Sequence, residues 1–324
     1  MNKAIKSLIP LFIQKLWIHL SSRRKKQFFV LLVLIILSAF AEIISLGAVL
    51  PFLAVITAPE TIFGEPYIQP LTSFLGIETP EQIILPITFI FISASLLAAF
   101  MRIFVLWFST KLSYGTGADI SVEAYRKTLY QPYTVHVSRN SSEVVSSIMT
   151  KINSATGTLN LTLAFIASTI IAVAIIVALL SIDPFIAISS SIFFGICYFI
   201  ISLFTRPKLQ VNSKSINLST SGSQKILQEG LGGVRDILLD GTQKIYIDKF
   251  NQQQRIMRSS QGQNFFLGGS PRFAMESLGM ILIALLSLLL LSGSNEANEF
   301  IPILGAMALG AQRLIPAMQQ IYIG

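Results

Sequence analysis

Charged residues are scarce in this chain. Asp, Glu, Lys and Arg make up 12% of its 324 residues and hydrophobic residues 52%, whereas an average soluble domain has about 25% charged residues. The mean hydropathy is +0.67, and the apolar residues gather in runs of about 18 or more, enough to cross a hydrocarbon core of about 30 Å. The composition argues against an ordinary soluble fold and predicts an all-α integral membrane protein.

Residues that commonly carry chemistry are also few. The chain has one cysteine, Cys197, and two histidines, His19 and His136, which excludes an intrachain disulfide and a thiolate metal cluster. We therefore expect no catalytic residue, metal or cofactor in this chain. The pattern G-x-x-x-x-G-K-[ST] is absent, and the glycine-rich stretches 230–233 and 268–269 lack the lysine and hydroxyl that would meet phosphate and magnesium. No ATPase site is predicted.

Basic residues are missing from particular segments. The net charge is +8, yet residues 59–82 contain four glutamates and no Lys or Arg, and the turn at Asp183 and the segment 292–299 also lack basic residues. The first 27 residues, in contrast, contain seven basic residues and no acidic one. This is the positive-inside distribution. It predicts a multi-pass protein with both termini in the cytoplasm, and it makes nucleic-acid binding unnecessary to explain the charge.

The first 27 residues are predicted to form a cytoplasmic amphipathic helix and a basic anchor. Apolar residues between Ala4 and Leu20 share one helical face, which is typical of an interfacial helix. A cleaved signal peptide is the alternative, but charges interrupt the apolar stretch and no small-residue cleavage site follows it. The run Arg23–Lys26 then lies where it would meet an anionic inner leaflet.

Residues 28–324 are predicted to form six membrane spans. Gly47 and Pro51 are expected to bend the first span, and Pro184 is expected to start the fourth after a tight turn at residues 181–184. The spans are predicted at about 28–57, from 83, around 159–180, at 185–204, at 273–291 and from 299 onward.

The internal connections are expected to be helical hairpins. Span 4 should continue to about residue 228 as a rod of about 66 Å, well beyond the bilayer. Glycines at 230, 232, 233 and 241 should then break the helix and isolate the segment 234–240 at the tip. In the first hairpin, Pro132 should break the rod before residues 141–143 begin the next helix.

This organisation resembles the transmembrane domain of type I ABC exporters. Gln131-Pro132-Tyr133, and residues 228–236 continuing to Phe250, look like the two coupling regions of that family. More specific likenesses link three segments to its lipid-linked oligosaccharide flippase branch, and the resemblance extends over essentially the whole chain. These segments are Phe40–Phe52, Ser270-Pro271-Arg272 with Glu276 and Gly279, and Arg313–Ala317.

The resemblance implies partners. Family members act with a nucleotide-binding domain that holds ATP and magnesium, and that domain is absent from this sequence; we expect it on a separate chain or in a missing C-terminal part. Two copies should pair, giving a homodimer or a heterodimer. The residues expected to dock the ATPase lie at the two hairpin tips: Pro132, Tyr133, His136, Val234, Arg235 and Asp236.

Five charged residues are candidates to line a substrate cavity. Glu42 lies halfway along span 1, where an ionised group facing lipid would cost about 2.5–3.5 kcal/mol, so it should face protein or water. Arg102 and Arg313 are possible partners, and their guanidinium groups suit phosphate or pyrophosphate. Arg272 and Glu276 share a helical face at the entrance of span 5. The alternative for each is a structural ion pair.

Three functions are compatible with the sequence. The first is an ATP-driven flippase or exporter of a lipid-linked glycan or other amphiphile. The second is a peptide, protein or drug exporter of the same architecture, and the third is a membrane sensor, scaffold or truncated remnant without a motor. Acidic external loops and the absence of a transit sequence favour the cytoplasmic (inner) membrane, with an organelle membrane as the alternative.

Overall fold

The computed structural model describes residues 20–63, 76–77, 79–138, 147–292 and 297–323. Every regular element in these ranges is helical. The chain divides into two compact units. Unit 1 comprises Met1–Ala187 and Leu285–Gly324, and unit 2 comprises Ile188–Ala284.

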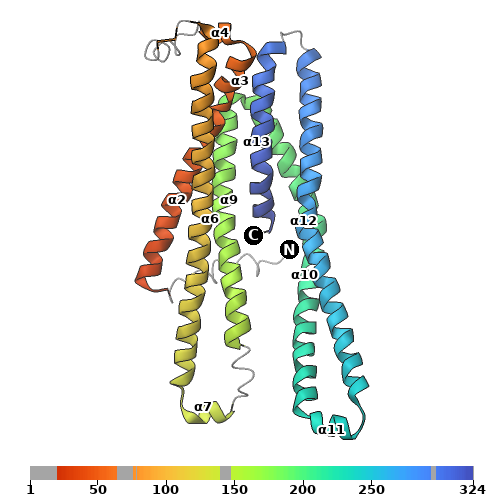
Figure 1. Ribbon diagram of the computed structural model, residues 1–324. Helices are drawn as coiled ribbons and strands as arrows, with labels where there is room; N and C mark the ends of the chain where they lie inside the picture. Colours follow the sequence, from red (N-terminus) through yellow and green to blue (C-terminus); the bar gives the residue numbers. More distant parts are fainter. Residues whose placement is uncertain (1–19, 64–75, 78, 139–146, 293–296, 324) are drawn as a thin grey trace. The chain divides into compact units, whose positions relative to one another are not determined.

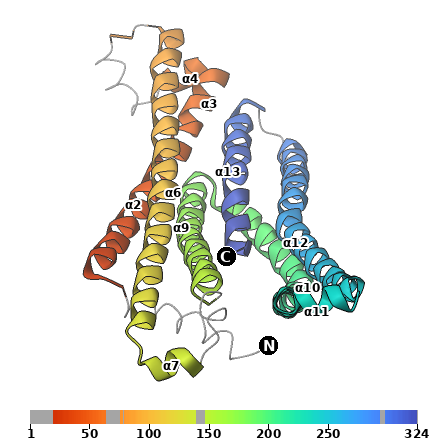
Figure 2. The ribbon, with the colours of Figure 1, turned by 60° about the horizontal axis from the view of Figure 1, so that its bottom comes forward.

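Unit 1 is a bundle in which α2, α6, α9 and α13 are the long members, with short helices at the ends (Figures 1 and 2). Its first long helix is interrupted at Ala48, between α2 and α3, near the predicted bend. Its elements are α2 (Ser22–Gly47), α3 (Val49–Thr57), α4 (Pro59–Phe63), the 3-10 helix η1 (Pro80–Ile83), α6 (Ile84–Leu129), α7 (Tyr133–Ser138), the π-helical turn η2 (Ser147–Lys151), α9 (Ile152–Ile182) and α13 (Ala297–Ile323).

Most of α10 (Pro184–Gly232) and α12 (Gln243–Ser292), together with α11 (Val234–Leu239), forms unit 2 (Figure 1). The two long helices contain 49 and 50 residues, or about 74 and 75 Å at 1.5 Å per residue. They pack side by side in antiparallel fashion. Gln254 donates a hydrogen bond to Ser223 at 3.2 Å, and Thr220 lies 3.3 Å from the sulfur of Met257. Polar side chains therefore contribute to this seam beside the buried Met257.

Four helical segments in the described part of the chain are long and apolar enough to cross a membrane. They are Ser22–Thr57, Pro80–Leu129, Ile148–Ile182 and Ala187–Gly232. Between 17% and 44% of the most apolar window in each is buried inside the protein. The other apolar side chains on these windows are left for lipid or another protein surface, as expected of a chain that uses the bilayer as solvent.

The apolar core of unit 1 lies where α2, α6 and α9 meet. Since lipid is as apolar as a leucine side chain, close packing rather than hydrophobic transfer holds such helices together. Gly117 of α6 leaves so little space that an added Cβ would collide with Thr156 of α9, and one at Gly310 of α13 would lie 2.7 Å from Leu179. The core itself consists of Leu31, Ile35, Val105, Leu112, Leu159, Leu163 and Ala167.

The helix starts and turns agree closely with the predictions. The turn before Pro184 and the start of α6 at Ile84 lie where the sequence placed them, and α13 begins two residues before Glu299. The predicted amphipathic helix between Ala4 and Leu20 lies outside the described residues except for Leu20, and so does the predicted helix start at 141–143.

The basic run Arg23–Lys26 lies in the first turn of α2, where Ser21 caps the helix by accepting a hydrogen bond from the Arg24 backbone N–H at 3.4 Å. One detail differs from the predictions. Gly230 and Gly232 lie inside α10, and the chain breaks only at Gly233 and at Gly241. Gly241 has a φ of 65°, which costs glycine little, whereas Gly230 and Gly232 keep helical geometry because one glycine costs a helix only about 1 kcal/mol.

Candidate functional site: a charged cluster on α2, α6 and α13

A polar stripe runs along one face of the most apolar part of α2. Ser38, Glu42 and Ser45 are spaced by four and three residues, so their side chains share a helical face, and all three are fully buried. A glutamate with no exposed surface needs compensation, because an ionised carboxylate without partners is costly at membrane depth. The compensation comes from two other helices.

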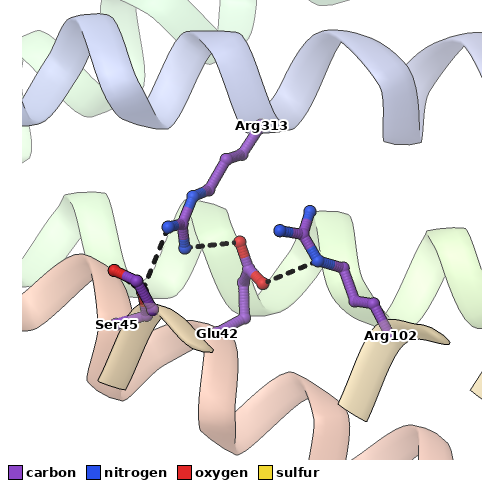
Figure 3. Close-up of polar contacts among 5 residues, drawn as sticks. Glu42, Ser45, Arg102 and Arg313 are labelled. Carbon is purple, nitrogen blue, oxygen red and sulfur yellow. Dashed lines mark hydrogen bonds and ion pairs between the residues drawn. The ribbon is translucent and has the colours of Figure 1, made fainter. Parts of the chain in front are cut away.

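Two arginines converge on the Glu42 carboxylate from opposite sides (Figure 3). Nη1 of Arg313, on α13, donates a hydrogen bond to Oε1 at 2.8 Å, and its Nη2 donates to Ser45 Oγ at 3.0 Å. Nε of Arg102, on α6, lies 3.6 Å from Oε2, which is an ion pair beyond hydrogen-bonding distance. The structure thus brings together three of the five predicted cavity residues.

The two arginines are held differently. The Arg313 side chain is 18% exposed and has two hydrogen-bond acceptors, whereas the Arg102 side chain is 41% exposed and, among the described residues, makes only the long contact with Glu42. A guanidinium carries five N–H donors, so Arg102 keeps most of its capacity to donate to an anion. Two guanidinium groups and one carboxylate also leave the cluster with a net positive charge.

Neighbouring hydroxyl groups extend the cluster. Oγ of Ser45 lies 3.3 Å from Oγ of Ser95 on α6. Among the described residues, Oε2 of Glu42 and Oγ of Ser38 have no hydrogen-bond partner although both atoms are buried. Such groups usually bind a water or an exchangeable ligand. Sequence reasoning missed the serines, although their spacing with Glu42 was a usable signal.

Arg272 and Glu276 belong to unit 2 and form a separate pair. Nε of Arg272 donates to Oε1 of Glu276 at 2.8 Å, one helical turn away on α12. The two side chains are 53% and 40% exposed. This geometry matches the structural alternative, a helix-surface ion pair, and such pairs contribute about 0.3–0.5 kcal/mol.

The predicted docking residues occupy the ends of helical hairpins. Pro132 precedes α7 and Tyr133 begins it; Tyr133 is 81% exposed, and His136 also lies at the surface. In unit 2, Val234 begins α11, and Arg235 and Asp236 are exposed in its first turn. Both short helices present apolar side chains to their surroundings, among them Val137 at 68% and Leu239 at 74% exposure.

A second ion pair explains how a basic run can start α2. Positive charge at a helix N-terminus opposes the helix dipole, but Nε of Arg24 lies 2.7 Å from the Asp119 carboxylate of α6. The guanidinium also rests against Gly115, where an added Cβ would lie 2.8 Å from its nitrogens. The sequence did not predict this contact, because the two residues lie 95 positions apart.

Long apolar helices and a buried ionic cluster between them define a polytopic helical membrane protein. Residues 1–309 match the family model described as the ABC transporter transmembrane region. The chain belongs to that family, and its function is therefore that of a membrane domain of an ABC exporter, a class whose transmembrane regions pair with nucleotide-binding domains.

Proposed function

We propose that this chain is the membrane-spanning part of an ATP-driven flippase or exporter that moves a lipid-linked glycan or another anionic amphiphile. The observation that carries the proposal is the net positive cluster of Glu42, Arg102 and Arg313 among apolar helices. A cluster that served only to join helices would be expected to balance its charge, because an excess charge at membrane depth costs free energy.

Arg102 is the residue that would meet the substrate. Arg313 is committed to Glu42 and Ser45, while Arg102 is the more exposed arginine and its contact with Glu42 is long. A phosphate or pyrophosphate group accepts two parallel N–H bonds from one guanidinium. Glu42 would then keep Arg102 oriented between transport events, and the sugar hydroxyls of a glycan could meet the serine hydroxyls of α2.

The remaining parts of the proposal concern the assembly. The chain would contribute six spans, with α12 and α13 as the last two, and both termini would lie on the cytoplasmic side of the inner membrane. Two copies would enclose the pathway, because six spans surround too little space for a large amphiphile. Pro132, Tyr133 and His136 of one hairpin, and Val234, Arg235 and Asp236 of the other, would contact the ATPase that binds ATP and magnesium.

Transport would need no covalent chemistry from this chain. ATP binding would bring two nucleotide-binding domains together, and α7 and α11 would transmit the movement into the long helices that they terminate. At about 1.5 Å per residue, α10 and α12 exceed twice a hydrocarbon thickness of about 30 Å, so they can carry displacement from the cytoplasm into the bilayer.

The test is ATP-dependent flipping of a fluorescent polyprenyl-pyrophosphate glycan in vesicles that contain the complex with its nucleotide-binding domain. The R102M variant should lose about tenfold or more in flipping, since a hydrogen bond to a charged group contributes about 1.5–3 kcal/mol. R102K should retain part of the activity. R258M, which removes an exposed arginine of α12, is the matched control and should be unchanged. Full flipping by R102M would refute the assignment of this cluster.

A further inference from the structure

The exposed face of α6 carries a ladder of aromatic rings that ends on a lysine. The rings of Phe100 and Phe104 have centroids 6.1 Å apart, and those of Phe104 and Trp107 are 5.7 Å apart. Nζ of Lys111 lies 4.7 Å from the centre of the Trp107 ring, within range of a cation–π interaction. Phe100 is 62% exposed and Trp107 is 52% exposed. The ladder thus has an apolar end and a charged end.

The position of the ladder along α6 matches one edge of a bilayer. From Leu85, two residues after the end of the 3-10 helix η1, to Trp107 the helix advances 22 residues, or about 33 Å. This distance corresponds to a hydrocarbon core of about 30 Å crossed by a slightly tilted helix. Tryptophan concentrates at such edges, and a lysine one turn further can extend toward the lipid headgroups.

Unit 1 places the basic start of α2 near the same level. The Arg24 guanidinium rests against Gly115, one helical turn beyond Lys111, and pairs with Asp119. Arg23, Arg24, Lys25 and Lys26 follow one another there, and such runs bind anionic membrane surfaces. This observation is independent of the aromatic ladder, and it assigns the same stretch of α6 to the headgroup region.

We infer that Trp107 and Lys111 form a binding site for an anionic phospholipid, with Phe100 and Phe104 against its acyl chain. The charges are complementary. The next acidic groups along α6 are engaged elsewhere, with Asp119 on Arg24 and Glu123 within 3.8 Å of Arg126 and 3.7 Å of Lys127. Among the described residues, Lys111 therefore has no acidic partner, and its ammonium group is available to a phosphate. The inference does not depend on the identity of the transported substrate.

The chain offers its own reporter, because it contains only two tryptophans, Trp17 and Trp107. In the W17F variant, Trp107 fluorescence is measured in phosphatidylcholine vesicles that contain equal mole fractions of brominated phosphatidylglycerol or brominated phosphatidylcholine. Bromine quenches by contact, so the ratio of the two quenching constants gives the lipid preference at the ring. We expect a preference of about five-fold for the anionic lipid, as for one lysine near an anionic surface.

The same measurement on two further variants isolates the lysine. In W17F/K111M the preference should fall to about one, because the headgroup contact is lost while the ring stays in lipid. In W17F/K127M, which changes an exposed lysine on the same helix, the five-fold preference should persist. Equal quenching by both lipids in W17F would overturn the headgroup contact. If neither lipid quenches Trp107, protein such as a second copy of the chain must cover this face. That result would overturn the site entirely.

Discussion

Removing the partners of Glu42 one at a time should destabilise the protein unequally. In R313M, the fully buried carboxylate loses its 2.8 Å hydrogen bond and, within the described part of the chain, keeps only Arg102 at 3.6 Å. Breaking a buried pair costs about 3–5 kcal/mol, and the remaining arginine should hold the loss near the lower end, at about 3 kcal/mol. In R102M the lost contact is long and the arginine is 41% exposed, so we expect less than about 1 kcal/mol.

The free energy of unfolding can be measured by titration with sodium dodecyl sulfate in mixed micelles, at matched protein and lipid concentrations. E42Q removes the charge but can still accept a hydrogen bond, and it should cost about 1.5–3 kcal/mol. The double variant E42Q/R313M should cost clearly less than the sum of the single changes, because residues in direct contact are not additive. Equal losses in R102M and R313M, or strict additivity, would refute the assignment of Arg313 as the structural partner.

Two other contacts in unit 1 can be tested by the same titration. The D119N change removes the ion pair with Arg24. Because the Asp119 side chain is 53% exposed, the change should lower the free energy of unfolding by about 0.2–1 kcal/mol at low salt and by less at 1 M salt. An effect that does not depend on salt would contradict an electrostatic origin. G117V should lower the free energy of unfolding by about 1–3 kcal/mol, because its side chain forces apart the α6–α9 contact at Thr156. G157A adds a methyl group that meets nothing within 4 Å, so it should be neutral or slightly stabilising. Equal effects of the two changes would contradict close packing at Gly117.

Sequence reasoning predicted the helices well because their signals are local. Pro184 starts a helix where expected, and the 49 residues of α10 continue past the apolar stretch, in agreement with the predicted rod to about residue 228. The placement of Gly230 as a helix breaker was wrong, because an isolated glycine only weakens a helix. The presence of a glycine alone could not determine this, since the surrounding residues also decide whether the helix continues.

The charged members of the candidate site were predicted from the sequence, but its serines and the different roles of its two arginines were not. A glutamate among apolar residues demands partners, which is why the sequence alone was enough to group Glu42 with Arg102 and Arg313. The division of roles between the arginines depends on distances of 2.8 and 3.6 Å, and these depend on how α2, α6 and α13 pack. The ion pair of Arg24 and Asp119 could not be predicted for the same reason: the two residues lie far apart in sequence and meet only because α2 packs on α6.

The seam between α13 and the first long helix contains two different kinds of contact. Beyond the interruption at Ala48, Gly305 of α13 allows Leu53 of α3 to approach so closely that an added Cβ would collide with it. Before the interruption, the seam depends on the ion pair of Arg313 with Glu42. The van der Waals contact between Gly305 and Leu53 does not depend on charge. The ion pair between Arg313 and Glu42 does depend on charge. Substitutions that change charge should therefore weaken this seam at Arg313 and leave it intact at Gly305, whereas substitutions that change side-chain volume should do the reverse.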